Sequence, residues 1–324
     1  MFMKTNTTKH IILFLLLILL NIEAYSQSSL ILGWNETLTE EQKHSNPTYL
    51  AYPMSMKDEI PTMSCHDEPV WYFSVSTTTK VRFSHGNLQY QASTHTWRFA
   101  ENQWDFVGNA SEGTVYETGT KCDNVKISSY YSGWIDLFGW ATSGYNTSYP
   151  YLTIYNPTKY GPSTSTIPSQ YDWGVYNMYP WRTLTHTEWE YLINSRPNAS
   201  QLFCKAIVHD VRGLLILPDN WVNSGEINLS FGNSLYDDNV ISNVNWDIME
   251  NDGAIFLPAA GYRNVTVTDG YSIVYNYYNP IGCYWSLNYQ NTQRAWALNF
   301  SSSNINSQYY YRSQGNSVRL VQNL

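Results

Sequence analysis

Charged side chains are scarce in this sequence, and basic ones are the scarcer kind. Asp, Glu, Lys and Arg make up 14% of the 324 residues, compared with about 25% in ordinary soluble domains. The formal net charge is −8, because 18 Lys and Arg face 26 Asp and Glu. Nucleic acids and anionic membrane surfaces bind clustered Lys and Arg. The charge balance therefore argues against both partners, and we expect no nucleic-acid binding.

Long apolar runs are absent after the first 20 residues. Ile11–Leu20 is unbroken and apolar, follows Lys4 and Lys9, and precedes a small-residue cleavage pattern that ends at Ser26. This arrangement is typical of a secretory signal peptide, and the run is too short to span a bilayer. We expect residues 1–26 to be removed on export. The predicted location is secreted or at the cell surface, with no membrane span after cleavage.

Cysteine and histidine are too few and too scattered to define a catalytic or metal centre. None of the seven His has another His four residues away, and no G-x-S-x-G motif occurs. A helical metal-binding pair and a serine-hydrolase elbow are therefore both missing. The four Cys are Cys65, Cys122, Cys204 and Cys283. In an exported chain they permit three disulfide pairings, and free buried thiols are an equal alternative.

Aromatic residues are abundant, which argues against disorder despite the low charge. They make up 16% of the chain, with 28 Tyr and 13 Trp, whereas disordered chains lack them. Residues 27–69 are polar and acidic without a sustained period, so we predict a tether. From Val70 apolar and β-branched residues alternate with polar ones, as in strands. We therefore predict one large binding domain over 70–324.

One helix is predicted, over residues 183–197. Thr185 and Glu188 have the spacing of a capping box, and Pro197 provides a stop. The apolar face is formed by Trp189, Leu192 and Ile193. A long irregular stretch precedes this helix, and Asp172–Gly174 within it is expected to dock on the core through its Trp.

Short apolar segments predict the remaining strands. Residues 213–218 and 253–258 each begin with Gly and end with Pro, as buried strands between turns do. A polar loop is predicted between them, over residues 223–250. Three further strands are expected at 283–286, 295–300 and 317–321, arranged as a meander. Because the helix precedes this meander rather than alternating with it, the predicted class is α+β.

These segments, taken in order, resemble a known family. Residues 181–192 (WRTLTHTEWEYL) resemble the helix of formylglycine-generating-enzyme-like (sulfatase-modifying factor) domains. The later segments GAIFLPAAGYR, GCYWSL, AWALNF and GNSVRLV are similar to the end of such domains in secreted Bacteroidetes proteins. The resemblance implies a large, loop-rich C-type-lectin-like fold with antiparallel strands and few helices. It implies the fold more strongly than the function.

The resemblance does not extend to the family's oxidase chemistry. Enzymes of this family bind copper through a C-x4-C pair, whose soft thiolates suit Cu(I). Cys283 stands in the corresponding part of this chain without a partner at that spacing. We therefore expect no enzymatic activity and no cofactor. A copper-dependent oxidoreductase is one alternative, and a structural subunit of a surface assembly is another.

One short acidic cluster has the oxygen ligands that calcium prefers. Asp237, Asp238 and Asn239 are adjacent in the predicted polar loop. Calcium takes six to eight oxygen ligands, and the sequence identifies no others for this cluster. An ordinary polar loop is therefore the favoured interpretation.

The C-terminal stretch is the candidate binding surface. Residues 270–324 contain no Asp, Glu or Lys and are rich in Tyr, Ser and Asn, the residue types of antibody-like binding surfaces. Within 295–300, alternation separates Trp296, Leu298 and Phe300 from Ala295, Ala297 and Asn299. The predicted ligand-binding residues are Asn288, Tyr289, Gln290, Asn291, Thr292, Arg294, Asn299, Ser301, Ser303, Asn304, Asn306, Gln308, Tyr309, Tyr310 and Arg312.

The same composition suggests how such a surface could arise. Some members of the resembled family are varied by diversity-generating retroelements, which enrich Asn, Tyr and Ser near the end of the domain. We therefore expect a receptor or adhesin that binds a protein or glycan on a cell or phage surface. A polar loop set without a ligand is the structural alternative, and the sequence leaves the oligomeric state open.

Overall fold

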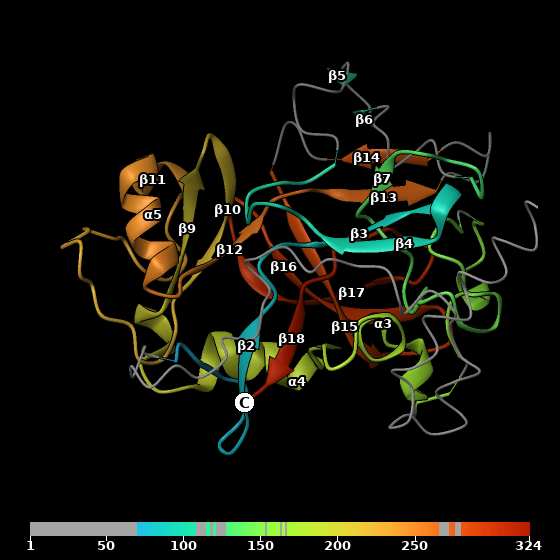
Figure 1. Ribbon diagram of the computed structural model, residues 1–324, viewed down its shortest axis with the longest axis horizontal. Helices are drawn as coiled ribbons and strands as arrows, with labels where there is room; N and C mark the ends of the chain where they lie inside the picture. The colour runs from blue at the N-terminus through green and yellow to red at the C-terminus, as the bar shows by residue number, and fades with distance from the viewer. Residues whose placement is uncertain are drawn as a thin grey trace, which may run out of the picture. The chain divides into compact units, whose positions relative to one another are not determined.

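A computed structural model describes residues 70–107, 115–116, 119–120, 128–152, 154–162, 164–165, 167–265, 272–275 and 280–324 (Figure 1). The predicted signal peptide and tether, and also Cys65 and Cys122, lie outside these residues. The described chain has an α+β fold of small, mainly antiparallel sheets with few helices. The predicted class is therefore confirmed at this level.

The strands within the described ranges form five sheets of three or four strands. Each is antiparallel apart from the parallel pairing of β11 with β9. Two four-stranded sheets have the spatial orders β1 (Phe73–Ser74), β2 (Lys80–Phe83), β18 (Leu320–Asn323), β8 (Arg182–Thr183) and β11 (Val240–Ile241), β9 (Phe203–Val208), β10 (Val211–Ile216), β12 (Ile255–Pro258). A third four-stranded sheet has the order β13 (Tyr262–Val265), β14 (Ser272–Tyr275), β6 (Gly119–Thr120), β5 (Val115–Tyr116). The two three-stranded sheets have the orders β15 (Gly282–Tyr289), β16 (Arg294–Phe300), β17 (Ile305–Tyr311) and β4 (Thr96–Phe99), β3 (Leu88–Gln91), β7 (Trp134–Ile135).

The predicted helix forms where its capping residues place it. It consists of α4 (His186–Glu190) and a following π-helical turn over Tyr191–Ser195. Thr185 accepts a hydrogen bond from the backbone N–H of Glu188, whose carboxylate accepts one from the N–H of Thr185. This reciprocal pair satisfies two backbone donors that a helix start leaves free.

Two helices were not predicted. The region 223–250 was expected to be a polar loop, but α5 (Asn243–Asn251) begins within it, capped by the Ser242 hydroxyl. Trp246 and Met249 of α5 are buried three residues apart, which fixes its inner face. The short helix α3 (Trp173–Asn177) follows Asp172, and its Trp173 is fully buried, so the expected docking of that Trp is confirmed.

The sheet of β15, β16 and β17 is covered on both faces over much of its area. Leu298 and Phe300 of β16 belong to one core, which also contains Trp189 of α4. Ala295 and Ala297 point the other way and belong to a second core. The predicted alternation is thus correct, but the face that Asn299 shares with Ala295 and Ala297 is buried, whereas Asn299 was expected at the surface.

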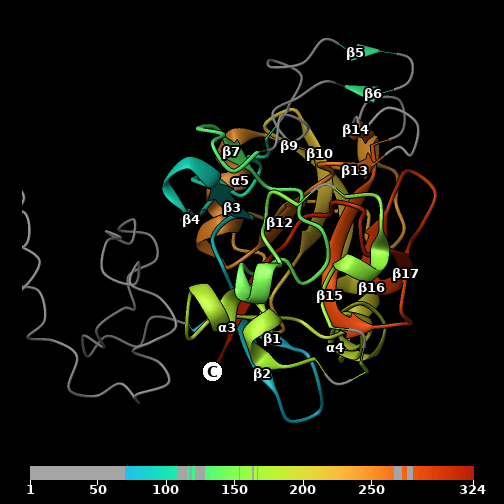
Figure 2. The same cartoon turned by 90° about the vertical axis from the view of Figure 1, so that its right-hand side faces the viewer.

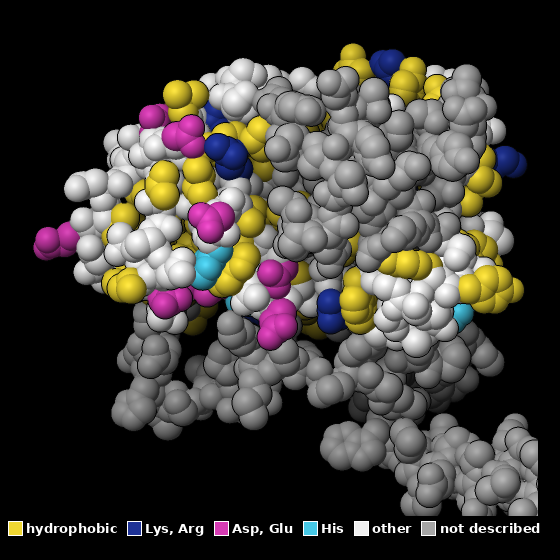
Figure 3. All heavy atoms as spheres, turned by 90° about the horizontal axis from the view of Figure 1, so that it is seen from above, with side chains coloured by type: hydrophobic (Ala, Val, Ile, Leu, Met, Phe, Trp, Pro, Cys, Tyr) yellow, Lys and Arg dark blue, Asp and Glu magenta, His cyan; other side chains and the backbone are white. Residues whose placement is uncertain are grey.

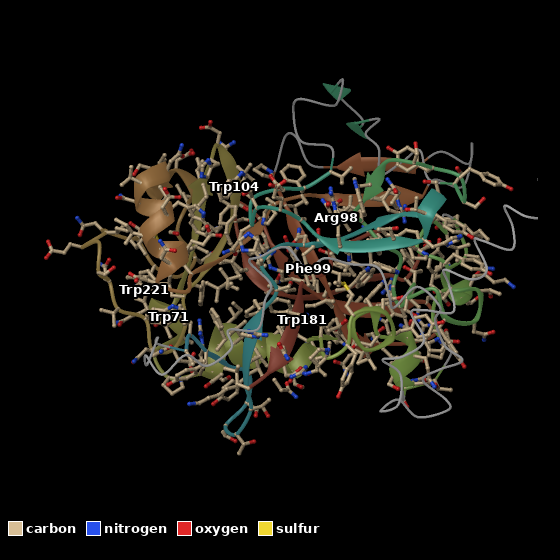
Figure 4. All side chains as sticks on the ribbon, in the orientation of Figure 1. Trp71, Arg98, Phe99, Trp104, Trp181 and Trp221 are labelled. Carbon is tan, nitrogen blue, oxygen red and sulfur yellow. The ribbon has the colours of Figure 1, made fainter. Side chains whose placement is uncertain are left out.

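Aromatic contacts connect the other sheets to these cores. Phe99 of β4 meets Trp181 edge to face, with ring centroids 5.3 Å apart (Figure 4). Trp104 stacks on His209 at 3.7 Å and meets Trp246 of α5 edge to face at 6.3 Å, which closes a third core. Within the described ranges, the helices are all too short or too polar to cross a membrane.

Candidate functional site

The outer end of β16 and β17 carries the most prominent cluster of exposed aromatic and cationic side chains in the C-terminal region. Figure 2 shows β15, β16 and β17 side by side, with β17 outermost. The antiparallel register pairs Arg294 with Tyr311 and Trp296 with Tyr309. Because cross-strand partners point to the same side of a sheet, these four side chains share one face. We call them the Arg294 face.

The four side chains of the Arg294 face contact one another. The guanidinium carbon of Arg294 lies 5.1 Å from the ring centre of Tyr309 and 5.0 Å from that of Tyr311. Its Nη2 donates a hydrogen bond of 3.5 Å to the Tyr311 hydroxyl. Trp296 meets Tyr309 edge to face at 5.4 Å. Such contacts restrict the orientations of the aromatic rings.

Helix α4 supports the inner side of the Arg294 face. The imidazole of His186 stacks on Trp296 at 4.1 Å, and its Nε2 lies 3.3 Å from a carboxylate oxygen of Glu190. The backbone N–H of His186 donates to Oδ1 of Asn288 at 2.6 Å. The helix start is therefore tied to β15 next to the exposed rings.

The charge of this region is concentrated at Arg294. Residues 280–324 contain three charged side chains, and two of them, Arg312 and Arg319, are buried. The hydrogen bond to the Tyr311 hydroxyl is the main cause that raises the pKa of Arg294 above its ordinary value. In Figure 3 most visible Asp and Glu side chains lie instead on the half of the molecule that contains α5 and β9. The Arg294 face thus offers one cation among neutral side chains.

The structure divides the predicted ligand-binding residues by exposure. The exposed members are Thr292, Ser303, Gln308 and Tyr309. Those of intermediate exposure are Asn288, Tyr289, Gln290, Asn291, Arg294, Asn304, Asn306 and Tyr310. The buried members are Asn299, Ser301 and Arg312. A ligand can reach only the first two groups, so the last three were wrong as surface residues.

Arg312 is buried because it connects two loops to the end of β17. Its exposure is 0%, and its guanidinium donates to the carbonyls of Tyr160, Pro162 and Asn291 at 3.0, 3.0 and 2.8 Å. The guanidinium carbon also lies 4.7 Å from the ring of Trp140. Burial lowers the pKa of Arg312 to about 10, so the group stays charged at neutral pH and performs a structural role.

Asn299 and Ser301 are buried for local reasons. Asn299 lies on the inward side of β16, where its amide donates to the sulfur of Cys283 at 3.4 Å. Ser301 begins the turn that joins β16 to β17, and its N–H donates to the carbonyl of Asn304. The Ser301 hydroxyl also donates to Oδ1 of Asn304 at 2.9 Å, so both side chains contribute to the hairpin that carries the Arg294 face.

The side chain of Tyr310 points to the opposite face of the sheet from those of Tyr309 and Tyr311. It pairs with Ala295 and points into the second core, where its ring lies edge to face with Trp285 at 6.5 Å. Burial is the main cause that raises its pKa. Tyr309 and Tyr311 point the other way and are 46% and 40% exposed. A strand period of two separates the three consecutive tyrosines into one internal and two external rings.

Sequence reasoning missed three members of the site region. Tyr311 was omitted, although it is two residues from Tyr309 and so lies on the same side of any strand. Trp296 was placed on the same strand face as Leu298 and Phe300, but unlike them it is only half-buried, because the core covers this face of β16 from Leu298 onward. His186 was not among the predicted binding residues, and no sequence signal indicates its stacking on Trp296.

The acidic cluster of Asp237, Asp238 and Asn239 does not converge on one point. Asp237 is exposed and lies 3.5 Å from Arg212, while Asp238 accepts the N–H of Leu235 at 2.7 Å. Asn239 is buried and donates to the carbonyls of Lys205 and Ser230. Each side chain has its own structural partner, which favours the loop interpretation. Among the described residues, His, Cys, Asp and Glu form no metal-holding group.

Cys204 and Cys283 are free, buried thiols, so the pairings that involve them are absent from this structure. Burial raises the pKa of Cys204 to about 12 and that of Cys283 to about 11. A thiolate is the reactive form, so we expect a maleimide to label both more than about a hundredfold more slowly in the folded protein than in urea. Peptide mass spectrometry measures this, and equal labelling rates would contradict the burial.

Comparison with known proteins gives one partial match. The family described as a domain of unknown function (DUF8237) matches residues 240–321. No curated protein and no solved structure matches the chain. The matched segment runs from β11 into β18, and it contains all four residues of the Arg294 face but not His186.

Proposed function

We propose that this chain is an exported, non-catalytic receptor or adhesin that binds a protein or glycan on a cell or phage surface. We assign its domain to the C-type-lectin-like fold of the formylglycine-generating type. The small antiparallel sheets, the few helices and the capped helix α4 beside the final hairpin all support this assignment. The proposed ligand-binding region is the Arg294 face and its polar rim.

The observation that carries this proposal is the exposure of the Arg294 face at the end of a sheet whose β16 residues from Ala297 to Phe300 are buried. Tyr, Trp and Arg dominate the binding energy of protein interfaces, and here they occupy adjacent positions held by mutual contacts. Exposed Thr292 and Gln308 border them with adaptable hydrogen-bonding groups. Two exposed phenol rings and an indole around one cation form a partly apolar patch, and exposed patches of this kind mark interaction sites.

The surroundings of Cys283 support a non-catalytic function. The family's copper chemistry requires two thiolates, and the thiol of Cys283 is buried beside Asn299 with a raised pKa. The described Cys204 belongs to a different core. Copper-dependent oxidation of a peptide thiol by the wild-type protein would overturn this part of the proposal.

The retroelement origin of the surface remains part of the proposal. Trp285, Leu298, Phe300, Val318 and Leu320 form a buried framework, and exposed Ser, Gln and Tyr lie between them. Variation would therefore change the surface without changing the core. The DNA beside the gene tests this idea, because it should contain a near-copy of the 3′ coding segment and a reverse transcriptase.

Substitutions on the Arg294 face are expected to remove binding without unfolding the protein. We suggest selecting ligands for the wild type from a glycan array and a displayed peptide library. Arg294→Gln, Tyr309→Ala and Tyr311→Ala should each weaken a selected ligand by about tenfold or more. The melting temperature of each variant should stay close to that of the wild type, because these side chains lie on the surface.

Two controls make the outcome decisive. Tyr130, which is 87% exposed, lies outside the proposed face, so Tyr130→Ala should bind as the wild type does. Tyr310→Ala should instead lower the melting temperature, because Tyr310 packs in the second core. If the three face variants retain full affinity, the ligand binds elsewhere and the proposal fails.

A further inference from the structure

The outer edge of β17 exposes unpaired backbone groups. At one end of the β16–β17 ladder the backbone N–H of Ser301 donates to the carbonyl of Asn304. At the other end the backbone N–H of Arg312 donates to the carbonyl of Gln293. In an antiparallel ladder the hydrogen-bonded pairs alternate along each strand. The backbone groups of Asn306, Gln308 and Tyr310 therefore point towards β16. Those of the residues between them point away from the sheet, namely Ile305, Ser307, Tyr309 and Tyr311.

This edge has no partner among the described elements. The described pairings place β17 at the end of its sheet, next to β16 alone. The carbonyl of Tyr311 accepts a turn hydrogen bond from Gln314, whereas the N–H groups of Ile305, Ser307 and Tyr309 have no hydrogen-bond acceptor in the part of the chain that the structure describes. Figure 2 shows β17 on the outer side of the hairpin.

The edge also lacks the features that usually prevent strand addition. Proteins protect exposed edges with Lys, Pro, bulges or very short strands. β17 is seven residues long and contains neither charge nor Pro, and its pairing with β16 is regular throughout. An exposed edge of this length can template an added strand.

Arg294 extends towards this edge from the neighbouring strand. Its guanidinium lies between the rings of Tyr309 and Tyr311, and one of its nitrogens reaches the Tyr311 hydroxyl. Both tyrosines belong to the edge strand, so the cation lies over β17 on the side of the Arg294 face. Cross-strand neighbours of opposite charge attract each other. The positive charge of Arg294 would therefore attract acidic side chains that an added strand presents on this side of the sheet.

We propose that the outer edge of β17 binds an extended, acidic peptide segment of a partner protein as an added β-strand. The inference rests on the proposed function and specifies its ligand as a peptide. The free N–H and C=O groups recur at the strand period, which matches a peptide backbone. A second copy of β17 would be a poorer partner, because residues 301–311 contain no acidic side chain for Arg294.

Amide hydrogen exchange tests the edge in the free, full-length protein. The N–H groups of Asn306, Gln308 and Tyr310 should exchange slowly, since they bond to β16. Those of Ile305, Ser307 and Tyr309 should exchange at least about a hundredfold faster. Equal protection of both sets would mean that the edge is already covered, and the inference would fail.

A defined peptide series tests the occupant. The probe is a synthetic peptide that alternates threonine and valine with one central glutamate, and its matched versions carry glutamine or lysine at that position. The glutamate peptide should protect the N–H groups of Ser307 and Tyr309, and it should bind about fivefold more tightly than the lysine peptide. Arg294→Gln should abolish this preference. Equal affinity of the wild type for all three peptides would overturn the role of Arg294.

Proline on the edge tests the strand geometry. Ser307→Pro removes an outward N–H and places a ring where the added strand would lie, but it leaves the β16 ladder intact. Binding should fall by about tenfold or more. The control is Asn243→Pro, at the exposed first position of α5, where Pro is tolerated. If Ser307→Pro does not fold, peptides N-methylated on alternate residues test the same geometry, and undiminished binding would refute it.

The outcomes also separate this inference from the proposed function. If the selected ligands bind Ser307→Pro normally but are lost in Tyr309→Ala, the face binds through side chains alone and only the edge inference fails. If neither Ser307→Pro nor any of the three face variants loses binding, the proposed function itself is wrong. Protein that dimerises through β17, detected as slow exchange at the edge only at high concentration, would replace the partner peptide with a second copy.

Discussion

Replacing Arg312 with alanine is expected to lower the free energy of unfolding by about 3 to 5 kcal/mol. The guanidinium is fully buried and donates to three backbone carbonyls from two loops. Its removal takes the guanidinium donor from the carbonyls of Tyr160 and Pro162 and opens a cavity beside the ring of Trp140, whereas the Asn291 carbonyl still accepts the N–H of Arg294. Unpaired buried acceptors and cavities both destabilise the folded state. Urea denaturation measures the loss.

Arg294 provides the matched control for this prediction. It has the same chemistry and lies opposite the last residue of β17, but its contacts are to the partly exposed rings of Tyr309 and Tyr311. Arg294→Ala should therefore leave the free energy of unfolding close to that of the wild type. Similar losses in the two variants would contradict the assignment of Arg312 to the core and Arg294 to the surface.

The sequence predicted those elements whose local signals are strong. The capping box of Thr185 and Glu188 located α4, and the fully apolar segments located β10 and β12. These signals depend on neighbouring residues only. They are therefore available before any tertiary structure is known.

The elements that were missed depend on tertiary contacts or carry polar sequences. β17 has the sequence INSQYYY, which is as polar as a loop, and its strand is defined by pairing with β16. α5 is rich in Asn, and its inner face consists of Trp246 and Met249. The Ser242 cap and the spacing of these two residues were the signals that could have revealed it.

The candidate site was predictable by composition but not residue by residue. Composition indicated a Tyr- and Asn-rich surface near the C-terminus, and the Arg294 face lies within that region. It could not show that the sheet has a core on both sides, which buries Asn299 and turns Tyr310 inward. Which of two strand faces is covered depends on packing partners distant in sequence, here α4 and the segment around Trp140.

Replacing Asp172 with alanine is expected to cost about 3 kcal/mol or more of folding free energy. Its carboxylate is buried and accepts hydrogen bonds from the N–H groups of Gly174 and Val175, at 2.8 and 3.4 Å. It also accepts the N–H and the hydroxyl of Thr183, at 3.0 Å each. Alanine leaves these donors buried without acceptors. Thermal and urea unfolding both report the loss.

Asp237→Ala is the control, because that carboxylate is exposed and lies 3.5 Å from Arg212. An exposed pair of this kind contributes less than about 1 kcal/mol, so the control should unfold nearly as the wild type does. Asp172 begins α3 and holds Thr183 of β8, three residues before His186. The same carboxylate thereby fixes the chain that leads into α4 beneath Trp296. If Asp172→Ala is as stable as the control, the start of α4 is held by its capping box and by Asn288 instead.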